Sequence, residues 1–92
     1  MIISFRHKGL QELFEDGETR RLPQSRLEKI FERLAILDSA GLLQDLNRPG
    51  FRLHQLKGSL DGYLSINVTG NYRLIFRFVG ANVFDVDFLD TH

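Results

Sequence analysis

The chain has 92 residues, of which 42% are apolar and 11% aromatic, and these values predict one compact domain over residues 1–92 with a modest core. Twelve basic and twelve acidic residues give a formal net charge of zero, which counts against binding of nucleic acid through a global positive field. The absence of cysteine excludes disulfides, thiolate metal sites and thiol nucleophiles. No hydrophobic run follows Met1, so we expect no secretion signal, no membrane span and a cytoplasmic protein.

The first half of the chain predicts a short strand and two helices. Residues 2–5 form a β-rich run, and apolar residues at helical spacing predict a helix over residues 8–15 that closes near Gly17. A second, longer amphipathic helix follows Pro23 and ends near Gly41. Its charged face interleaves both signs, so we interpret that face as solvated surface. The apolar positions of the longer helix are Leu27, Ile30, Phe31, Leu34 and Leu37.

The second half of the chain is rich in strand signals. A helical turn over residues 42–49, which ends in a Pro-Gly breaker, separates it from the helices. We predict a turn at residues 57–62, a tight hairpin turn at Gly70-Asn71, a turn at residues 80–82, and strands over residues 51–56, 63–69, 72–79 and 83–89.

The strand over residues 72–79 has one aromatic and one basic face. Alternation places Tyr72, Leu74, Phe76 and Phe78 on the first, and Arg73, Ile75 and Arg77 on the second. We therefore predict an α+β fold in which an N-terminal strand and two helices pack on one face of an antiparallel sheet. The opposite, concave face is left wet and available for a ligand.

Several polar residues have an ordinary structural explanation. Lys57 begins a turn, where lysine usually only adds solubility, and His7 has no partner identifiable from the sequence, so we expect it at the surface. His54 alternates with apolar neighbours, and a lone histidine in that setting is structural rather than catalytic by roughly three to one. Arg73 and Arg77 lie near Asp85 and Asp87 of the following strand, and cross-strand ion pairing is the ordinary explanation for all four. We prefer this explanation for Arg77, Asp85 and Asp87.

Segments spread over essentially the whole chain carry a resemblance to a known family. They are Phe5-Arg6-His7-Lys8-Gly9-Leu10, Asp45-Leu46-Asn47-Arg48-Pro49-Gly50, Arg52-Leu53-His54-Gln55-Leu56-Lys57-Gly58, Gly70-Asn71-Tyr72-Arg73 and Asp85-Val86-Asp87-Phe88-Leu89-Asp90-Thr91-His92. In order and spacing they resemble the HigB toxins of bacterial toxin-antitoxin systems, the plasmid maintenance killer branch of the RelE superfamily. No single segment is specific for this family, but the five segments together are.

The resemblance implies a fold, an activity and partners. The fold would be that of the microbial ribonucleases and RelE. The activity would be metal-independent cleavage of messenger RNA on the ribosome, without a cofactor, which inhibits translation. The toxin would be neutralised by a HigA-type helix-turn-helix antitoxin, and through that antitoxin the pair would bind operator DNA and repress its own operon.

The resemblance also assigns roles to residues, and these roles fit the chemistry. Cleavage by the adjacent 2′-hydroxyl needs a base, an acid and cations around the phosphate. His92 can exchange protons near neutral pH, and Asp90 can act as base or orient the imidazole, which leaves the acid and base assignment open. The implied catalytic residues are Lys57, Arg73, Asp90 and His92, and the implied substrate-binding residues are His54, Asn71 and Thr91.

One departure from the family pattern concerns the end of the chain. Thr91 stands where the family commonly has tyrosine, and stacking of a base on an aromatic ring is worth about 1 to 3 kcal/mol. We therefore predict a toxin weaker than the family norm. The neutral net charge predicts poor cleavage of naked RNA, because a ribonuclease without its own electrostatic grip needs the ribosome to present the message.

Other functions stay open from the sequence. One alternative is a family member that binds its antitoxin and co-represses the operon without cutting RNA. Another is a toxin that acts on free RNA or on a different ribosomal site. A metal enzyme is disfavoured because His7, His54 and His92 show no ligand spacing, and a stand-alone DNA-binding protein is disfavoured because no helix-turn-helix is recognisable.

Overall fold

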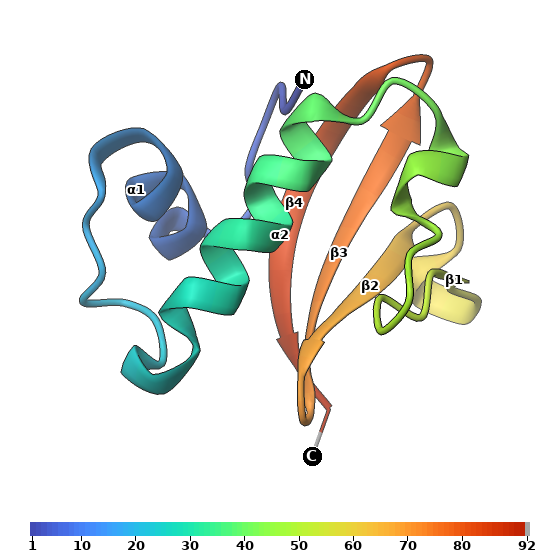
Figure 1. Ribbon diagram of the computed structural model, residues 1–92. Coiled ribbons are helices and arrows are strands. Elements are labelled where there is room, and N and C mark those ends of the chain that lie inside the picture. Colours follow the sequence, from blue (N-terminus) through green and yellow to red (C-terminus); the bar gives the residue numbers. More distant parts are fainter. Residues whose placement is uncertain (92) are drawn as a thin grey trace.

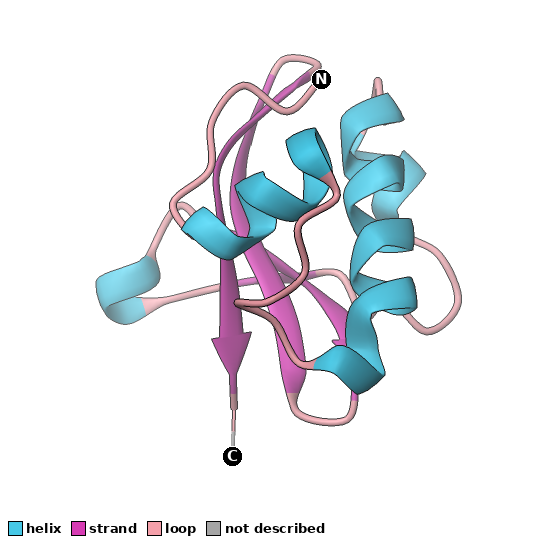
Figure 2. Ribbon diagram, turned by 90° about the vertical axis from the view of Figure 1, so that its left-hand side faces the viewer, coloured by secondary structure: helices cyan, strands magenta, loops and turns pink. Residues whose placement is uncertain are grey.

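The computed structural model describes residues 1–91 and has two layers, helices and a sheet (Figure 1). The strands form an antiparallel sheet in the order β1-β2-β3-β4. The helices pack on one of its faces, so the predicted α+β arrangement is confirmed (Figure 2). Short 3₁₀ turns cover Gln24–Arg26, Leu43–Leu46 and Gly58–Leu60, and the main elements are α1 (Lys8–Asp16), α2 (Leu27–Ser39), β1 (His54–Gln55), β2 (Leu64–Thr69), β3 (Tyr72–Val79) and β4 (Asn82–Asp90).

Helix α1 is closed at both ends by local chemistry. Gly17 adopts a left-handed backbone with φ 72°, and its N–H donates to the carbonyl of Leu13, as expected for a glycine after a helix. At the other end, Nδ1 of His7 accepts from the N–H of Leu10 at 3.2 Å. The expectation that His7 lies free at the surface is therefore wrong. It is half-buried, and its ring meets the ring of Phe88 edge-on with the centroids 6.0 Å apart.

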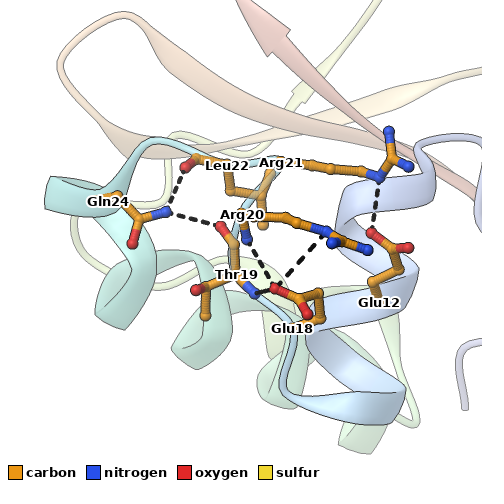
Figure 3. Close-up of polar contacts among 7 residues, drawn as sticks. All are labelled: Glu12, Glu18, Thr19, Arg20, Arg21, Leu22 and Gln24. Atoms are coloured by element: carbon orange, nitrogen blue, oxygen red, sulfur yellow. Dashed lines mark hydrogen bonds and ion pairs between the residues drawn. The ribbon is translucent and has the colours of Figure 1, made fainter.

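Polar contacts order the connection between α1 and α2 (Figure 3). The carboxylate of Glu18 accepts from the N–H of Thr19, and the amide of Gln24 donates to the carbonyl of Thr19 at 2.8 Å. Arg21 reaches back to Glu12 in α1 with Nε 2.9 Å from the carboxylate. Exposed ion pairs add little stability, so the bonds to the main chain are the ones that order this connection.

The core lies between α2 and the sheet. Ile30, Leu34 and Leu37 of α2 and Leu74 and Phe76 of β3 are all fully buried, as predicted. Each such side chain contributes about 1.5–3 kcal/mol through burial. Phe31, which we also predicted on the apolar face of α2, is instead 48% exposed. Neither helix in the described part of the chain has the length and apolar character needed to cross a membrane.

The opposite face of the sheet is less wet than predicted. Ser65 and Ile75, which pair across β2 and β3 on that face, have exposed fractions of 0% and 3%. Part of the cover comes from Arg73, whose side chain folds back onto Ser65. The predicted ion pair between Arg77 and Asp85 is present on the neighbouring strands at 2.9 Å. The same prediction for Asp87 is wrong within residues 1–91, because the Asp87 carboxylate instead accepts from the N–H of Phe88.

The N-terminal segment runs parallel to β4 but forms only isolated bridges to it. Ile2 bridges Val83 and Phe5 bridges Val86, where we predicted a continuous strand. A bulge in β4 explains the pattern. Asp85 has a φ of 56°, and the extra residue brings Val83 and Val86, which are three positions apart, into the core together.

The predicted strand over residues 51–56 is shortened to His54–Gln55. The segment still follows β2, since the N–H of Asn67 donates to the carbonyl of Phe51 at 2.5 Å. The interruption lies at Arg52, whose φ of 50° is in the left-handed region that β-strands do not use. This conformation turns the Arg52 carbonyl out of the ladder, and that carbonyl becomes part of the site described next.

Candidate active-site cleft

A cleft of about 540 Å³ opens on the face of the sheet opposite the helices. Side chains from β1, β2 and β3 and the residue that follows β4 line it, so it draws on chain segments that are far apart in sequence. A volume of this size accommodates a nucleotide-sized ligand. The lining residues are Arg52, Leu53, His54, Leu56, Ser65, Arg73 and Thr91.

Arg73 is the best-anchored cation of the cleft. Its Nε and Nη2 atoms donate to the hydroxyl oxygen of Ser65 at 3.1 and 2.7 Å, and Nη2 also donates to the carbonyl of Arg52 at 3.1 Å. Ser65 is fully buried, and the Arg52 carbonyl is available because of the left-handed backbone there. The guanidinium is thus held on one side by uncharged oxygens, and its Nη1 group is left to donate to a phosphate.

The electrostatics of the cleft favour an anion. Burial, and to a smaller extent the positive charge of Arg52, lowers the pKa of Arg73 from its ordinary value. The group still stays charged at neutral pH, because an arginine guanidinium does not lose its proton in that range. No ion pair among residues 1–91 neutralises Arg73. The negative charge of a bound phosphate would offset both unfavourable contributions.

The end of the chain is fastened beside the cleft. The N–H and the hydroxyl of Thr91 both donate to the carbonyl of Asn71, each at 2.8 Å. Asn71 lies in the turn between β2 and β3, so this contact ties the residue after β4 to the neighbouring hairpin (Figure 1). His54 is exposed at the sheet edge opposite Ser65, which leaves its imidazole accessible to a ligand.

The structure brings together only some of the predicted site residues. His54, Arg73 and Thr91 line the cleft, whereas Asn71 contributes a backbone carbonyl outside it. Two further candidates do not line the cleft, and both are exposed: Lys57, which precedes a 3₁₀ turn, and Asp90, which ends β4 opposite Tyr72. His92 lies outside the described residues. Among residues 1–91 no cluster of three or more histidine, cysteine, aspartate or glutamate side chains could hold a metal ion.

Two polar residues of the cleft were missed by the sequence reasoning, Arg52 and Ser65. Two signals for Ser65 conflicted: the alternation of Leu64, Ile66 and Val68 with polar residues places it off the apolar face, whereas a regular hairpin through Gly70-Asn71 would pair it with Phe76 on the core face. The observed register pairs Ser65 with Ile75, since an extra residue enters β2 between Asn67 and Thr69. That bulge turns Ser65 to the same face as Arg73.

Sequence comparisons relate the whole chain to known proteins. The model of the family described as "RelE-like toxin of type II toxin-antitoxin system HigB" matches residues 3–92. The Endoribonuclease HigB of Proteus vulgaris is 41% identical over 92 residues, and the match covers 100% of both chains. The Toxin HigB-1 of Vibrio cholerae serotype O1 is 39% identical over 94 residues and covers 100% of this chain and 98% of its own length.

Solved structures show the same fold at low sequence identity. A chain of the YoeB-YefM complex from Staphylococcus aureus superposes with a TM-score of 0.58 at 15% identity, covering 95% of this chain and 93% of that one. The YoeB/ParE toxin from Agrobacterium tumefaciens gives 0.51 at 18% identity and covers 96% of both chains. The near-complete family match and the full-length identity of about 40% to two relatives lead to one conclusion: the chain belongs to the HigB-like family of RelE-like toxins of type II toxin-antitoxin systems.

Proposed function

We propose that this toxin is an endoribonuclease that cleaves messenger RNA on the ribosome and so inhibits translation. Family membership and the similarity to the Endoribonuclease HigB of Proteus vulgaris support the reaction class. The observation that carries the proposal is the guanidinium of Arg73, held by Ser65 and the Arg52 carbonyl in a cleft that no described carboxylate neutralises. We infer that this guanidinium binds a phosphate of the RNA.

The proposed reaction needs no external nucleophile. The 2′-hydroxyl attacks the adjacent phosphorus, a base removes its proton, and the bond from phosphorus to the 5′-oxygen breaks as an acid protonates that oxygen. Arg73 and Arg52 stabilise the extra negative charge on the phosphorane oxygens, which exists only in the transition state. Lys57 supplies a further cation in this scheme, and His92 and Asp90 exchange the protons. Asp90 and His92 flank Thr91, which is fastened at the cleft, and their placement at the phosphate belongs to the proposal.

The proposed substrate contacts distribute between the cleft and its rim. His54 and Thr91 contact the RNA from the cleft walls, and Asn71 contributes from the hairpin turn beside Thr91. The zero formal charge supports presentation of the message by the ribosome in the cytoplasm, because this chain lacks the basic surplus that binds free RNA tightly. A HigA-type antitoxin is the proposed partner, and operator DNA is contacted through it.

A single-turnover assay tests the proposal. Messenger RNA on programmed ribosomes is treated with the native chain, R73A, H92A or R77A, and ribosome-free RNA is treated in parallel. We expect cleavage on ribosomes by the native chain and by R77A, whose arginine lies on the same strand and pairs with Asp85 away from the cleft. R73A and H92A should lose activity by about a hundredfold or more.

Each of the other outcomes would indicate a different function for this protein. An intact message in every lane would leave a module that binds its antitoxin and co-represses the operon. Equal cleavage of ribosome-free RNA would identify a toxin with a different target. Full activity of R73A would remove the cleft from the mechanism.

A further inference from the structure

A charged side chain lies buried on the helix side of the sheet. Arg33 of α2 has an exposed fraction of 6%, and its Nε donates to the carbonyl of Asn67 at 3.0 Å. Its guanidinium carbon lies 4.2 Å from the centre of the Phe51 ring, and Nη1 pairs with the neighbouring Glu32. Burial of a charge is expensive, and an apolar residue of similar volume usually stabilises a fold as well or better. The contacts of Arg33 therefore call for an explanation other than core stability.

Those contacts meet at one junction of the main chain. Phe51 and Asn67 are themselves joined, because the N–H of Asn67 donates to the Phe51 carbonyl at 2.5 Å. Arg33 thus holds the segment before β1 through the ring and β2 through the carbonyl. The bulge that turns Ser65 toward Arg73 also begins at Asn67.

The junction borders the cleft. The residue after Phe51 is Arg52, whose φ of 50° points its carbonyl at Nη2 of Arg73. A left-handed backbone at a residue other than glycine persists only where its surroundings enforce it. The clamp on Phe51 from one side and the bond to Arg73 from the other are the contacts that enforce it here.

We propose that Arg33 is a positioning residue for the cleft: by clamping Phe51 against Asn67 it aims the Arg52 carbonyl at Arg73 and so fixes the phosphate-binding guanidinium. The catalytic part of this inference rests on the proposed ribonuclease function, whereas the geometric part does not. Arg33 itself lies on the helix side and does not line the cleft, so it acts only through the residues that it holds.

Two substitutions and a matched control test the clamp. R33M keeps an apolar stem but removes the donor and the planar cation, and R33K keeps the charge and a donor without the planar face. R77M is the control, because Arg77 also bonds a partner and lies over a ring, that of Phe84, yet stands outside the cleft. The readouts are the NMR signals of the Arg73 Nη2 hydrogens, the single-turnover cleavage rate on programmed ribosomes, and the folded fraction from circular dichroism.

We expect R33M to shift the Arg73 Nη2 signals toward those of a solvated arginine and to slow cleavage by about ten- to a hundredfold at an unchanged folded fraction, since small misplacement of a catalytic group has effects of that size. R33K should fall between R33M and the native chain, and R77M should match the native chain in both readouts. Native Arg73 signals in folded R33M, or a loss of rate no larger than that of R77M, would overturn the clamp.

The two proposals fail in different ways. If the native chain cleaves nothing, the ribonuclease proposal fails while the Arg73 signals still decide the clamp. If R33M does not fold, R33K decides alone, and native signals with a native rate in R33K would refute the positioning role.

Discussion

The buried hydroxyl oxygen of Ser65 accepts two hydrogen bonds from the guanidinium of Arg73, at 3.1 Å from Nε and 2.7 Å from Nη2. Both residues lie on the sheet face opposite the helices, on neighbouring strands whose register is shifted by a bulge. Together with the bond from Nη2 to the Arg52 carbonyl, these bonds leave the Nη1 group of Arg73 for a ligand. Arg73 is therefore held in one orientation before any RNA arrives, and preorganisation of this kind is what transition-state stabilisation requires.

Removal of the Ser65 hydroxyl should weaken the toxin more than the fold. A hydrogen bond to a charged group contributes about 1.5–3 kcal/mol, so S65A should slow single-turnover cleavage by roughly ten- to a hundredfold. The free energy of unfolding should fall by less than this, because the guanidinium of Arg73 is only half-buried and can bond water in place of the hydroxyl. S59A, which changes an exposed serine in the turn before β2, is the matched control. A native cleavage rate for S65A would show that the orientation of Arg73 is immaterial.

Substitution at Arg52 should separate stability from activity. The left-handed backbone costs a residue with a side chain about 1–2 kcal/mol, and glycine avoids this cost at the expense of a more flexible unfolded chain. R52G should therefore be more stable than R52A by about 1 kcal/mol in urea unfolding. Both variants should cleave about tenfold more slowly, since each loses a cation at the phosphate, and both should raise the pKa of Arg73 by removing the neighbouring positive charge. Greater stability of R52A than of R52G would contradict this account of the backbone.

Restoration of an aromatic ring at the end of the chain should strengthen the toxin. Base stacking worth about 1–3 kcal/mol predicts a gain of about 5- to 150-fold in cleavage by T91Y, with stronger growth arrest. The backbone N–H of residue 91 can still donate to the Asn71 carbonyl in this variant. T91V separates the two effects, because it loses the hydroxyl bond to Asn71 without adding a ring, so it should not gain activity. Growth arrest by T91Y equal to that of the native chain would refute the stacking argument.

Substitution of His7 should lower stability, whereas substitution of His92 should lower the cleavage rate. H7A removes the N-terminal cap of α1 and the edge contact with Phe88, so its free energy of unfolding should fall by about 1–2 kcal/mol. H7N keeps a cap acceptor and should lose less, and both variants should cleave at the native rate because His7 does not line the cleft. H92A should lose about a hundred- to ten-thousandfold in rate. Reduced cleavage by a fully folded H7A would place His7 in the mechanism after all.

Much of the fold was accessible from local sequence patterns. The spacing of apolar residues in α2, the αL glycine at Gly17 and the tight turn at Gly70-Asn71 each act within a few residues, and the structure contains all of them. The alternation along β3 assigned its aromatic and basic faces correctly, because the extra residues at the two register shifts lie in β2 and β4 and not in β3. The resemblance added the family and a list of candidate residues, of which His54, Arg73 and Thr91 line the cleft.

The partners of those residues depended on contacts between distant segments. His7 contacts Phe88 because β4 lies beside the start of α1. Arg52 adopts a left-handed backbone in a segment whose composition favours a strand. Such contacts join residues dozens of positions apart, and no periodicity records them.

The sequence by itself determined which segments are helices and strands and which family the chain resembles, because apolar periodicity and turn residues act locally. Only the tertiary structure decided which side chains meet in the cleft. A single inserted residue in β2 pairs Ser65 with Ile75 in place of Phe76, on the side of Arg73, and Arg33 of α2 bonds the main chain at that bulge.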